Sequence, residues 1–409
     1  MIDRDQLLTL DDAGLSALCR ISFGYGTGPG GQKRNKTSTA VRVELPDLPQ
    51  AKGGAEHFLN VEFALKEDLP WAKAGHVVAR DQLPLRVDAP PQAEGMECEG
   101  KVSVLEAEGG IEISAGATKA VVSRTSGTLS SLSMNGKTVL ADGPGGIVHG
   151  PRLTCMRAFT DNDIWLRKAR KAGEFGFYES GLAQLRYHVR ELKVLSSSEG
   201  AAVVRSVVEV NGAKSAGFMH VADYSFDRAG RVVVGNDVRP FGKMPPALPR
   251  LGLSMVLDSR LEGMRWYGRG PMENYIDRCS GSFLGQWTST VTGQYVPYAR
   301  VQDNGYKSDV RWAAFTDSSG DGVVARGSLP LFVQALHYTC EDMEFARHRA
   351  GQERIWNVKP PRDEVCLNLD IRQLGLGGGS CGPRPERQYI FDIRPEKWSI
   401  TLSPLAASR

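Results

Sequence analysis

The chain has 409 residues, of which 41% are hydrophobic and 24% are charged, and its formal net charge is +3. This is the composition of an ordinary globular protein, and the length suits two or three domains. A charge this small does not indicate nucleic acid or a membrane as the main partner. No apolar run of about 18 residues predicts a transmembrane helix.

The first residues lack a basic segment followed by an apolar core, so we expect no secretory signal. The 7 cysteines are an odd number, are widely scattered and form no Cys-x-x-Cys pair. This pattern favours free, mostly buried thiols in a reducing cytoplasm. We therefore expect a cytoplasmic protein with no metal and no cofactor in this chain.

The N-terminal segment begins with apolar residues at helical intervals over 7–19, followed by a glycine-rich run over 21–32 and a strand over 40–45. The glycines formally match G-x-G-x-x-G. However, polar residues 33–36 follow, where a dinucleotide fold needs an apolar helix. Walker A also fails, because Gln32 stands where that motif needs lysine.

Residues 28–32 read GPGGQ, and a strand follows them. This pattern resembles the Gly-Gly-Gln catalytic loop of class I peptide-chain release factors and related peptidyl-tRNA hydrolases. The resemblance implies that a glutamine amide could stabilise the charge that develops in ester hydrolysis. It covers residues 1–44 only, which we expect to be a truncated α/β segment, and only this segment would contact RNA or the ribosome. The alternative is a glycine-rich leader on another protein. The catalytic residues would be Gly30, Gly31 and Gln32.

A turn-rich boundary follows Leu45, and His57 to Lys66 then alternate as a strand, with Phe63 among the apolar positions. A second strand is expected at Val77, and a proline-rich linker from Pro84 to Glu97. Such a half-sandwich should have an unpaired edge.

From Cys98 onward, short alternating stretches recur with turns between them. Asn135-Gly136 predicts a hairpin, and residues 163–172 allow one helical interruption. The clearest predicted strands are 110–114, 201–210, 231–234 and 365–371. This pattern is typical of a mainly β protein with a large antiparallel β-sandwich.

Residues 266–278 read WYGRGPMENYIDR. Glycine and proline interrupt the polar side chains, so the stretch predicts a shaped connection between strands and not an amphipathic helix. We expect Trp266, Tyr267 and Tyr275 to pack in a core or an interface.

This stretch resembles the signature of the C-terminal β-sandwich in bacterial β-galactosidases of glycoside hydrolase family 2. The small chain of the two-subunit lactobacillar enzymes is the same region. Further matches follow the family's order: PWAKAGH at 70–76, RAFTDND at 157–163, YVPY at 295–298, QDNG at 302–305 and LGLGG at 374–378. The resemblance implies a partial immunoglobulin-like sandwich and linker over 45–97, and a galactose-mutarotase-like supersandwich over 98–409.

Glycoside hydrolysis normally needs two carboxyl groups flanking the scissile bond. The candidate pairs are Glu273 with Asp277, and Asp161 with Asp163, and all of these residues lie in predicted turns. We expect them to bind backbone groups or neighbouring domains. The family places its catalytic acid and nucleophile in a (β/α)-barrel that precedes this region. The resemblance thus implies a small-chain component of a β-galactosidase that acts on galactosides such as lactose with a catalytic chain, and it leaves open whether this chain is itself an enzyme.

In some family members a tryptophan after the Gly-Leu-Gly-Gly run stacks on the sugar. Here that run continues without an aromatic residue, and the nearest equivalent is Cys381. The implied substrate-binding residues are Gly379, Ser380, Cys381 and Gly382. The implied partners are a catalytic large chain or further copies of this chain, and carbohydrate, with no membrane. Two other readings are a free-standing carbohydrate-binding sandwich and a non-functional fusion of two gene remnants.

Overall fold

The computed structural model describes residues 20–24, 40–44, 56–87, 100–141, 149–167, 175–348 and 360–407. By their contacts, the residues divide into two units. One comprises Met1–Val61 and Gln82–Gly95, and the other comprises Glu62–Asp81 and Met96–Arg409.

In the smaller unit, β1 (Arg20–Gly24) pairs antiparallel with β2 (Ala40–Glu44). The strand predicted over 40–45 is therefore confirmed. The helix predicted over 7–19 lies outside the described residues, as do Gly30, Gly31 and Gln32 of the Gly-Gly-Gln run.

A separate two-stranded sheet consists of β3 (Glu56–Ala64) and β4 (Val77–Val87). Both strands were expected, but the linker predicted to begin at Pro84 was wrong there, because β4 continues to Val87. Each strand of a two-stranded sheet has a free edge. A proline in such a strand loses no ladder hydrogen bond when its missing N–H would face that edge.

The larger unit is built on a twelve-stranded antiparallel sheet with the main order β10-β15-β20-β19-β21-β14-β13-β12-β11, to which β18, β16 and β17 attach through β19. Its strands are β10 (Arg152–Thr154), β11 (Arg186–Ser197), β12 (Ala201–Asn211), β13 (Gly217–Asp227), β14 (Val232–Phe241), β15 (Arg250–Leu257), β16 (Gly263–Gly270), β17 (Phe283–Thr290), β18 (Lys307–Thr316), β19 (Gly322–Leu336), β20 (Val365–Gln373) and β21 (Glu396–Leu405).

Strand β19 changes partner along its length. Its first part, Gly322 to Gly327, pairs with β21, and its last part, Phe332 to Leu336, pairs with β20. Strand β18 also pairs with β19. Three branches of the sheet therefore meet on one strand.

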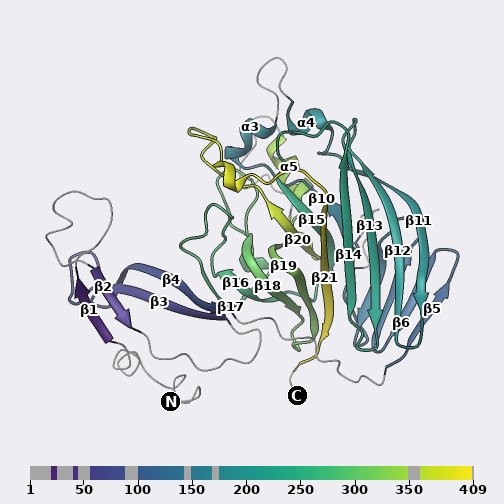
Figure 1. Cartoon of the computed structure of the whole chain (residues 1–409), viewed down its shortest axis with the longest axis horizontal. Helices are drawn as coiled ribbons and strands as arrows, with labels where there is room; N and C mark the ends of the chain where they lie inside the picture. The colour runs from purple at the N-terminus through teal and green to yellow at the C-terminus, as the bar shows by residue number, and fades with distance from the viewer. Residues whose placement is uncertain are drawn as a thin grey trace. The chain divides into compact units, whose positions relative to one another are not determined.

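A five-stranded sheet in the order β5-β6-β7-β8-β9 covers the inner face of β11 to β13, and Figure 1 shows β5 and β6 alongside those long strands. Its strands are β5 (Val102–Glu106), β6 (Gly110–Ala115), β7 (Thr118–Ser123), β8 (Leu129–Met134) and β9 (Lys137–Thr138). Asn135 and Gly136 join β8 to β9 with φ angles of 52° and 75°, which is the hairpin turn that the sequence predicts.

The core lies between these two sheets. Along β12, buried and half-buried side chains alternate from Ala202 to Val210, as expected for a strand with one face inward. Ile111, Val122 and Leu129 of the smaller sheet belong to the same apolar cluster as Val204 and Phe218 of the larger one. The expectation of a mainly β, antiparallel sandwich is confirmed.

The helices are short, and α3, α4 and α5 gather at one end of the large sheet (Figure 1). They are α3 (Ile164–Arg167), preceded by a 3₁₀ turn at Asp161–Asp163, α4 (Phe177–Ser180) and α5 (Cys340–His348). The helical interruption expected at 163–172 is present as far as Arg167, and residues 168–174 lie outside the described ranges. No helix in the described ranges is long and apolar enough to cross a membrane.

The stretch 266–278 is only partly the connection that we predicted, because its first half is the end of strand β16. Trp266 and Gly268 face inward there, and a Cβ on Gly268 would lie 2.8 Å from Val310 Cα. Position 268 therefore needs glycine because the neighbouring strand lies too close for a side chain. The surrounding glycine and proline residues had suggested a turn instead.

Lys137 links the two sheets of the sandwich. Its Nζ lies 2.6 Å from Asp317 Oδ2, 2.8 Å from Asp321 Oδ2 and 2.7 Å from Ser319 Oγ, in the turn between β18 and β19. Hydrogen bonds to the two carboxylates raise the pKa of Lys137, and its ammonium in turn lowers the pKa of Asp317.

Candidate functional site

The loop that follows β20, residues 374–383, contains every substrate-binding residue predicted for this region. Leu374 is buried, Gly379 is half-buried, and Ser380, Cys381 and Gly382 are exposed. The backbone N–H of Gly378 donates to Pro383 O at 2.9 Å, and that of Cys381 donates to Gly378 O at 3.1 Å, so the tip is a closed turn.

Two glycines make this turn possible. Gly377 has a φ of +60°, in the left-handed region that favours glycine. A Cβ on Gly379 would lie 2.4 Å from Asn162 O and 3.1 Å from Trp165 Cδ1. The loop therefore rests directly against residues 162–165.

Asp277 holds the base of the loop. Its carboxylate accepts hydrogen bonds from the backbone N–H groups of Leu376, at 2.9 Å, and Gly377, at 2.7 Å. A carboxylate that receives two backbone donors is well satisfied, and it fixes the direction of both peptide planes.

Asn162 holds the loop from the other side. Its Nδ2 donates to Gly377 O at 2.6 Å, and its Oδ1 accepts from Ser380 N at 3.1 Å. The Asn162 side-chain amide therefore joins Gly377 to Ser380 across the turn. This role requires both a donor and an acceptor on the same side chain.

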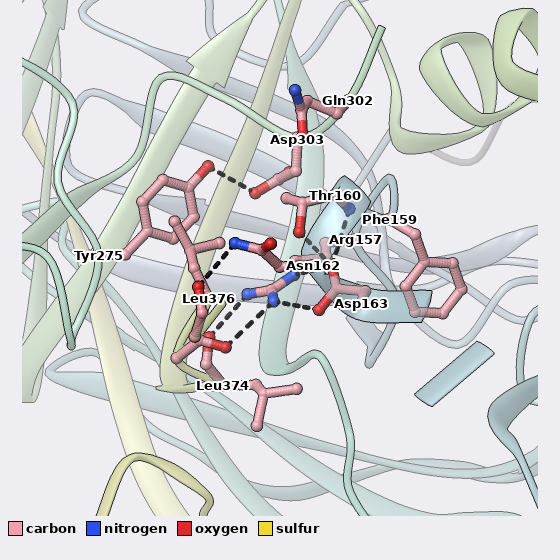
Figure 2. Close-up of polar contacts among 12 residues, drawn as sticks. Arg157, Phe159, Thr160, Asn162, Asp163, Tyr275, Gln302, Asp303, Leu374 and Leu376 are labelled. Carbon is pink, nitrogen blue, oxygen red and sulfur yellow. Dashed lines mark hydrogen bonds and ion pairs between the residues drawn. The ribbon is translucent and has the colours of Figure 1, made fainter. Parts of the chain in front are cut away.

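Arg157 and Asp163 form a fully buried ion pair beneath the loop (Figure 2). Two guanidinium nitrogens donate to the two carboxylate oxygens, at 3.1 and 2.6 Å. Arg157 also donates to Leu374 O at 2.7 Å. Burial opposes the charged form, but the charge and hydrogen bonds of Asp163 outweigh it and raise the pKa of Arg157 above its ordinary value.

Tyr275 and Asp303 extend this polar centre, as Figure 2 shows. Tyr275 Oη donates to Asp303 Oδ2 at 3.0 Å, and Gln334 Nε2 donates to Asp303 Oδ1 at 3.0 Å. Burial raises the pKa of Asp303 to about 7, against the opposing charges of Arg157 and Arg250. Asp303 can therefore change its protonation near neutral pH.

The remaining carboxylates of these motifs are also engaged. Glu273 accepts from Gly305 N at 2.8 Å, and it contacts Tyr298 and Arg278. Asp161 pairs with Arg300 at 3.0 Å. Each acid that the sequence offered as a catalytic candidate thus binds backbone or a neighbouring side chain.

The structure brings together motifs that are far apart in the sequence. Residues 157–163, 266–278 and 302–305 all contact the loop or its support. Asp277 was expected to bind backbone groups or neighbouring domains, and it does bind backbone, but the roles of Asn162 and Asp277 as holders of this particular loop were not predicted. Nothing in their local sequence indicates those roles. Trp165, packed against Gly379 with Arg384 at 4.8 Å above its ring, was missed as well.

The three aromatic residues of the 266–278 stretch were expected to pack in a core or an interface. Trp266 and Tyr275 are buried, as expected for core positions, and Tyr267 is half-buried. His337 binds Glu262 at 2.9 Å. Across the ranges that the structure describes, no three His, Cys, Asp or Glu side chains gather as a metal site would require.

Comparison with known proteins gives two family matches. A family model described as the β-galactosidase small chain matches residues 114–402, and one described as β-galactosidase domain 4 matches residues 33–86.

Curated relatives include the β-galactosidases of Priestia megaterium, 26% identical over 369 residues, and of Vibrio cholerae, 28% identical over 385 residues. The first alignment covers 89% of this chain and 33% of the relative, and the second covers 91% and 34%. The chain thus spans about a third of the length of these relatives. Among solved structures, a putative aldose 1-epimerase from Escherichia coli K12 is 10% identical with a TM-score of 0.39, covering 74% of this chain and 99% of that one.

Proposed function

Because this chain belongs to the β-galactosidase small-chain family, we propose that it is the C-terminal part of an enzyme that hydrolyses terminal β-D-galactosides such as lactose. The observation that carries the proposal is the support of the loop over residues 374–383. Side chains from two distant motifs fix its backbone through Asp277, Asn162 and Arg157.

Such support favours a binding role for the loop. Buried ion pairs are costly to desolvate, and a protein gains little stability from them over apolar packing. The buried Arg157–Asp163 pair is therefore better explained by a need to fix the geometry of the loop above it. Residues 379–382 would then form one wall of the sugar-binding site, through backbone groups and small side chains.

We place the catalytic carboxyl groups outside these 409 residues, on a separate chain or another part of the same protein. Glu273, Asp277 and Asp163 are each bound to the groups that they position. A glycosidase needs one carboxyl free to protonate the leaving group and another free to attack or to activate water.

The hairpin of β3 and β4 supports the expectation of a partner. Phe63 on β3, Val78 on β4 and Trp71 in the turn between them are 59%, 52% and 63% exposed, which is unusual for three neighbouring apolar side chains. A catalytic chain would cover them, and a further copy of this chain is the second candidate. The free thiols of Cys155, Cys340 and Cys366 suit a reducing cytoplasm.

The test is complementation. The chain is mixed with the part of the Vibrio cholerae β-galactosidase that precedes the matched region, and hydrolysis of a chromogenic galactoside is measured. A covalent chimera of the same two parts serves as a second arm, in case the separate pieces associate weakly. Activity in the mixture or the chimera, but not in either part alone, supports the proposal. If neither the mixture nor the chimera is active while the chain is folded, the proposal is contradicted and a fused remnant is favoured.

The release-factor-like interpretation of residues 1–44 stays a prediction. Gly30, Gly31 and Gln32 lie outside the described residues, and the domain 4 match already begins at residue 33. Peptidyl-tRNA hydrolysis that is lost in Gln32→Ala would support it.

A further inference from the structure

Arg384 is the charged residue that lies closest to the loop tip along the chain. The loop over residues 374–383 contains no Asp, Glu, Lys or Arg residue, and Arg384 follows its last residue directly. The loop that we assign to the wall of the sugar-binding site therefore leads into a single cation. Any full charge that this segment offers to a ligand comes from the Arg384 guanidinium.

The backbone at Arg384 is held in place from both sides. Pro383 and Pro385 flank it, and each proline restricts its own φ angle and the conformation of the residue before it. Pro383 O accepts a hydrogen bond from Gly378 N at 2.9 Å. Pro385 is buried against Gly377, where an added Cβ would lie 2.5 Å from Pro385 N. The side chain of Arg384 therefore starts from a fixed point beside the loop.

The side chain of Arg384 is oriented as well. Its Cζ lies 4.8 Å from the centroid of the Trp165 ring. Trp165 is itself fixed, because its Nε1 is buried and its Cδ1 packs against Gly379, where an added Cβ would lie 3.1 Å away. A guanidinium stacked on an aromatic ring keeps the N–H groups at its edge available for hydrogen bonds. The stack thus holds these donors close to Gly379 in the loop.

The donors of Arg384 are not used inside the chain. The side chain is exposed, and its guanidinium has no acceptor within the residues that the structure describes. The two acidic residues that follow it in the sequence are bound elsewhere, because Glu386 accepts from Gln388, and Asp392 accepts from Arg387. Neither carboxylate takes the donors of Arg384, so they are open to a ligand.

A guanidinium presented in this way selects a carboxylate. Its paired N–H groups match the two oxygens of a carboxylate, which accepts them in a bidentate geometry. A phosphate carries about 1.5 to 2 negative charges, and a single arginine would leave part of that charge uncompensated. Because the backbone and the Trp165 ring already fix the guanidinium of Arg384, binding costs little further side-chain entropy.

We propose that Arg384 is a specificity-determining residue that favours β-galactosides whose leaving group carries a carboxylate. This inference rests on the proposed function, in which residues 379–382 form one wall of the sugar-binding site. The galactosyl group of such a substrate is neutral, so the carboxylate belongs to the leaving group. A neutral leaving group would find no partner for the Arg384 charge.

The test compares lactobionate with lactitol as substrates of the chimera described above. Both hold galactose in the same linkage to an open-chain unit, which ends in a carboxylate in lactobionate and in a hydroxymethyl group in lactitol. Galactose release gives kcat/KM for each substrate. We expect kcat/KM to be higher for lactobionate by about 5-fold at low salt, mainly through KM. The preference should shrink at about 0.5 M salt, because exposed ion pairs are screened.

Variants assign the preference to one side chain. Arg384→Met keeps an unbranched side chain without the charge, and the ratio of the two kcat/KM values should fall by about 5-fold. Arg384→Lys keeps the charge without the paired donors, so it should retain part of the preference. Arg387→Met is the matched control, because it removes an exposed arginine three residues away that pairs with Asp392, and the ratio should not change.

The outcomes separate this inference from the function on which it rests. The inference is overturned by equal ratios in the wild type and Arg384→Met, or by a fall of the ratio in Arg387→Met. Cleavage of the chromogenic galactoside without cleavage of lactobionate also overturns it, and leaves the proposed function standing. If the mixture and the chimera are both inactive on all three substrates while the chain is folded, the proposed function is overturned and this inference falls with it.

Discussion

The carboxylate of Asp277 accepts a hydrogen bond from the backbone N–H of Leu376 at 2.9 Å, although 99 residues separate them in the chain. A second bond reaches Gly377 at 2.7 Å. This contact joins the turn after β16 to the loop after β20, so a change in one should be measurable in the other.

Asp277→Ala removes both acceptors from the base of the loop. We expect a loss of about 1–3 kcal/mol in the free energy of unfolding, because two backbone donors lose their partner. Activity in the complementation assay should fall by about 10-fold or more, since a displaced positioning loop acts on the transition state. Urea unfolding and the chromogenic assay measure the two effects. Asp392→Ala, at an exposed pair with Arg387, is the control and should change neither.

Arg157→Met breaks the buried pair and leaves the Asp163 carboxylate without its counter-charge. The expected cost is about 3–5 kcal/mol in unfolding free energy, the usual result of leaving one buried charge unpaired. Adding Asp163→Asn should recover part of that loss. If the cost in the double variant equals the sum of the costs of Arg157→Met and Asp163→Asn alone, the ion pair does not couple the two residues.

Asp303 makes stability depend on pH. Its pKa is raised to about 7 in the folded chain, while an unfolded aspartate titrates near 4. Below about pH 4 the residue is protonated in both states, and its contribution is fully present. As pH rises from about 4 to 7, only the unfolded state releases the proton, so this contribution is lost.

Asp303→Asn should therefore flatten the pH dependence in that window, as measured by urea unfolding from pH 4 to 8. Asp370 also has a raised pKa, through burial, but it is common to both proteins and drops out of the difference. Parallel curves for the two proteins would contradict the assignment.

The loop should tolerate change where its tip is exposed and not where it packs against Asn162. Gly379→Ala would place a Cβ 2.4 Å from Asn162 O, and we expect a loss of about 1–3 kcal/mol from overpacking. Cys381 is exposed, so Cys381→Trp should alter stability by no more than about 0.5 kcal/mol. If the tip faces substrate, the KM of the complemented enzyme should fall in Cys381→Trp. An unchanged KM would place the sugar elsewhere.

Lys137→Met should turn its anchor into a cation site. The variant leaves Asp317, Ser319 and Asp321 oxygens around the place of the ammonium, at the alternate spacing that calcium loops use. We expect a lower melting temperature at low salt, and about 10 mM CaCl₂ should raise it in the variant but not in the wild type. If calcium raised the melting temperature of both proteins equally, the prediction that calcium takes the place of the ammonium would be wrong.

The sequence allowed much of the fold to be predicted, because a strand with one buried face shows its period directly. Strand β12 and the hairpin at Asn135-Gly136 are such cases. Strand β16 was harder, since its glycines read as a turn and only the approach of Val310 explains Gly268. Pro84 led to the wrong prediction that a linker begins there. Proline normally costs a strand one ladder hydrogen bond, but at a free strand edge that cost disappears.

The loop residues were predicted by family resemblance, but the contacts that hold them were not. Asn162 acts through a carbonyl and an amide more than 200 residues away, and no periodicity relates such positions. The raised pKa of Asp303 depends on its complete burial between distant elements. Long-range pairing of this kind is a property of the tertiary structure alone.

Strand β19 has a consequence for how the large unit unfolds. Among the described strands, β19 is the only one that connects β20 to β21 through backbone hydrogen bonds. It also holds β18. Loss of β19 would separate the sheet into three pieces, each with an unpaired strand edge. Opening of β19 therefore releases all three branches at once, and the amide protons of β20 and β21 that pair with β19 should exchange through this same opening event.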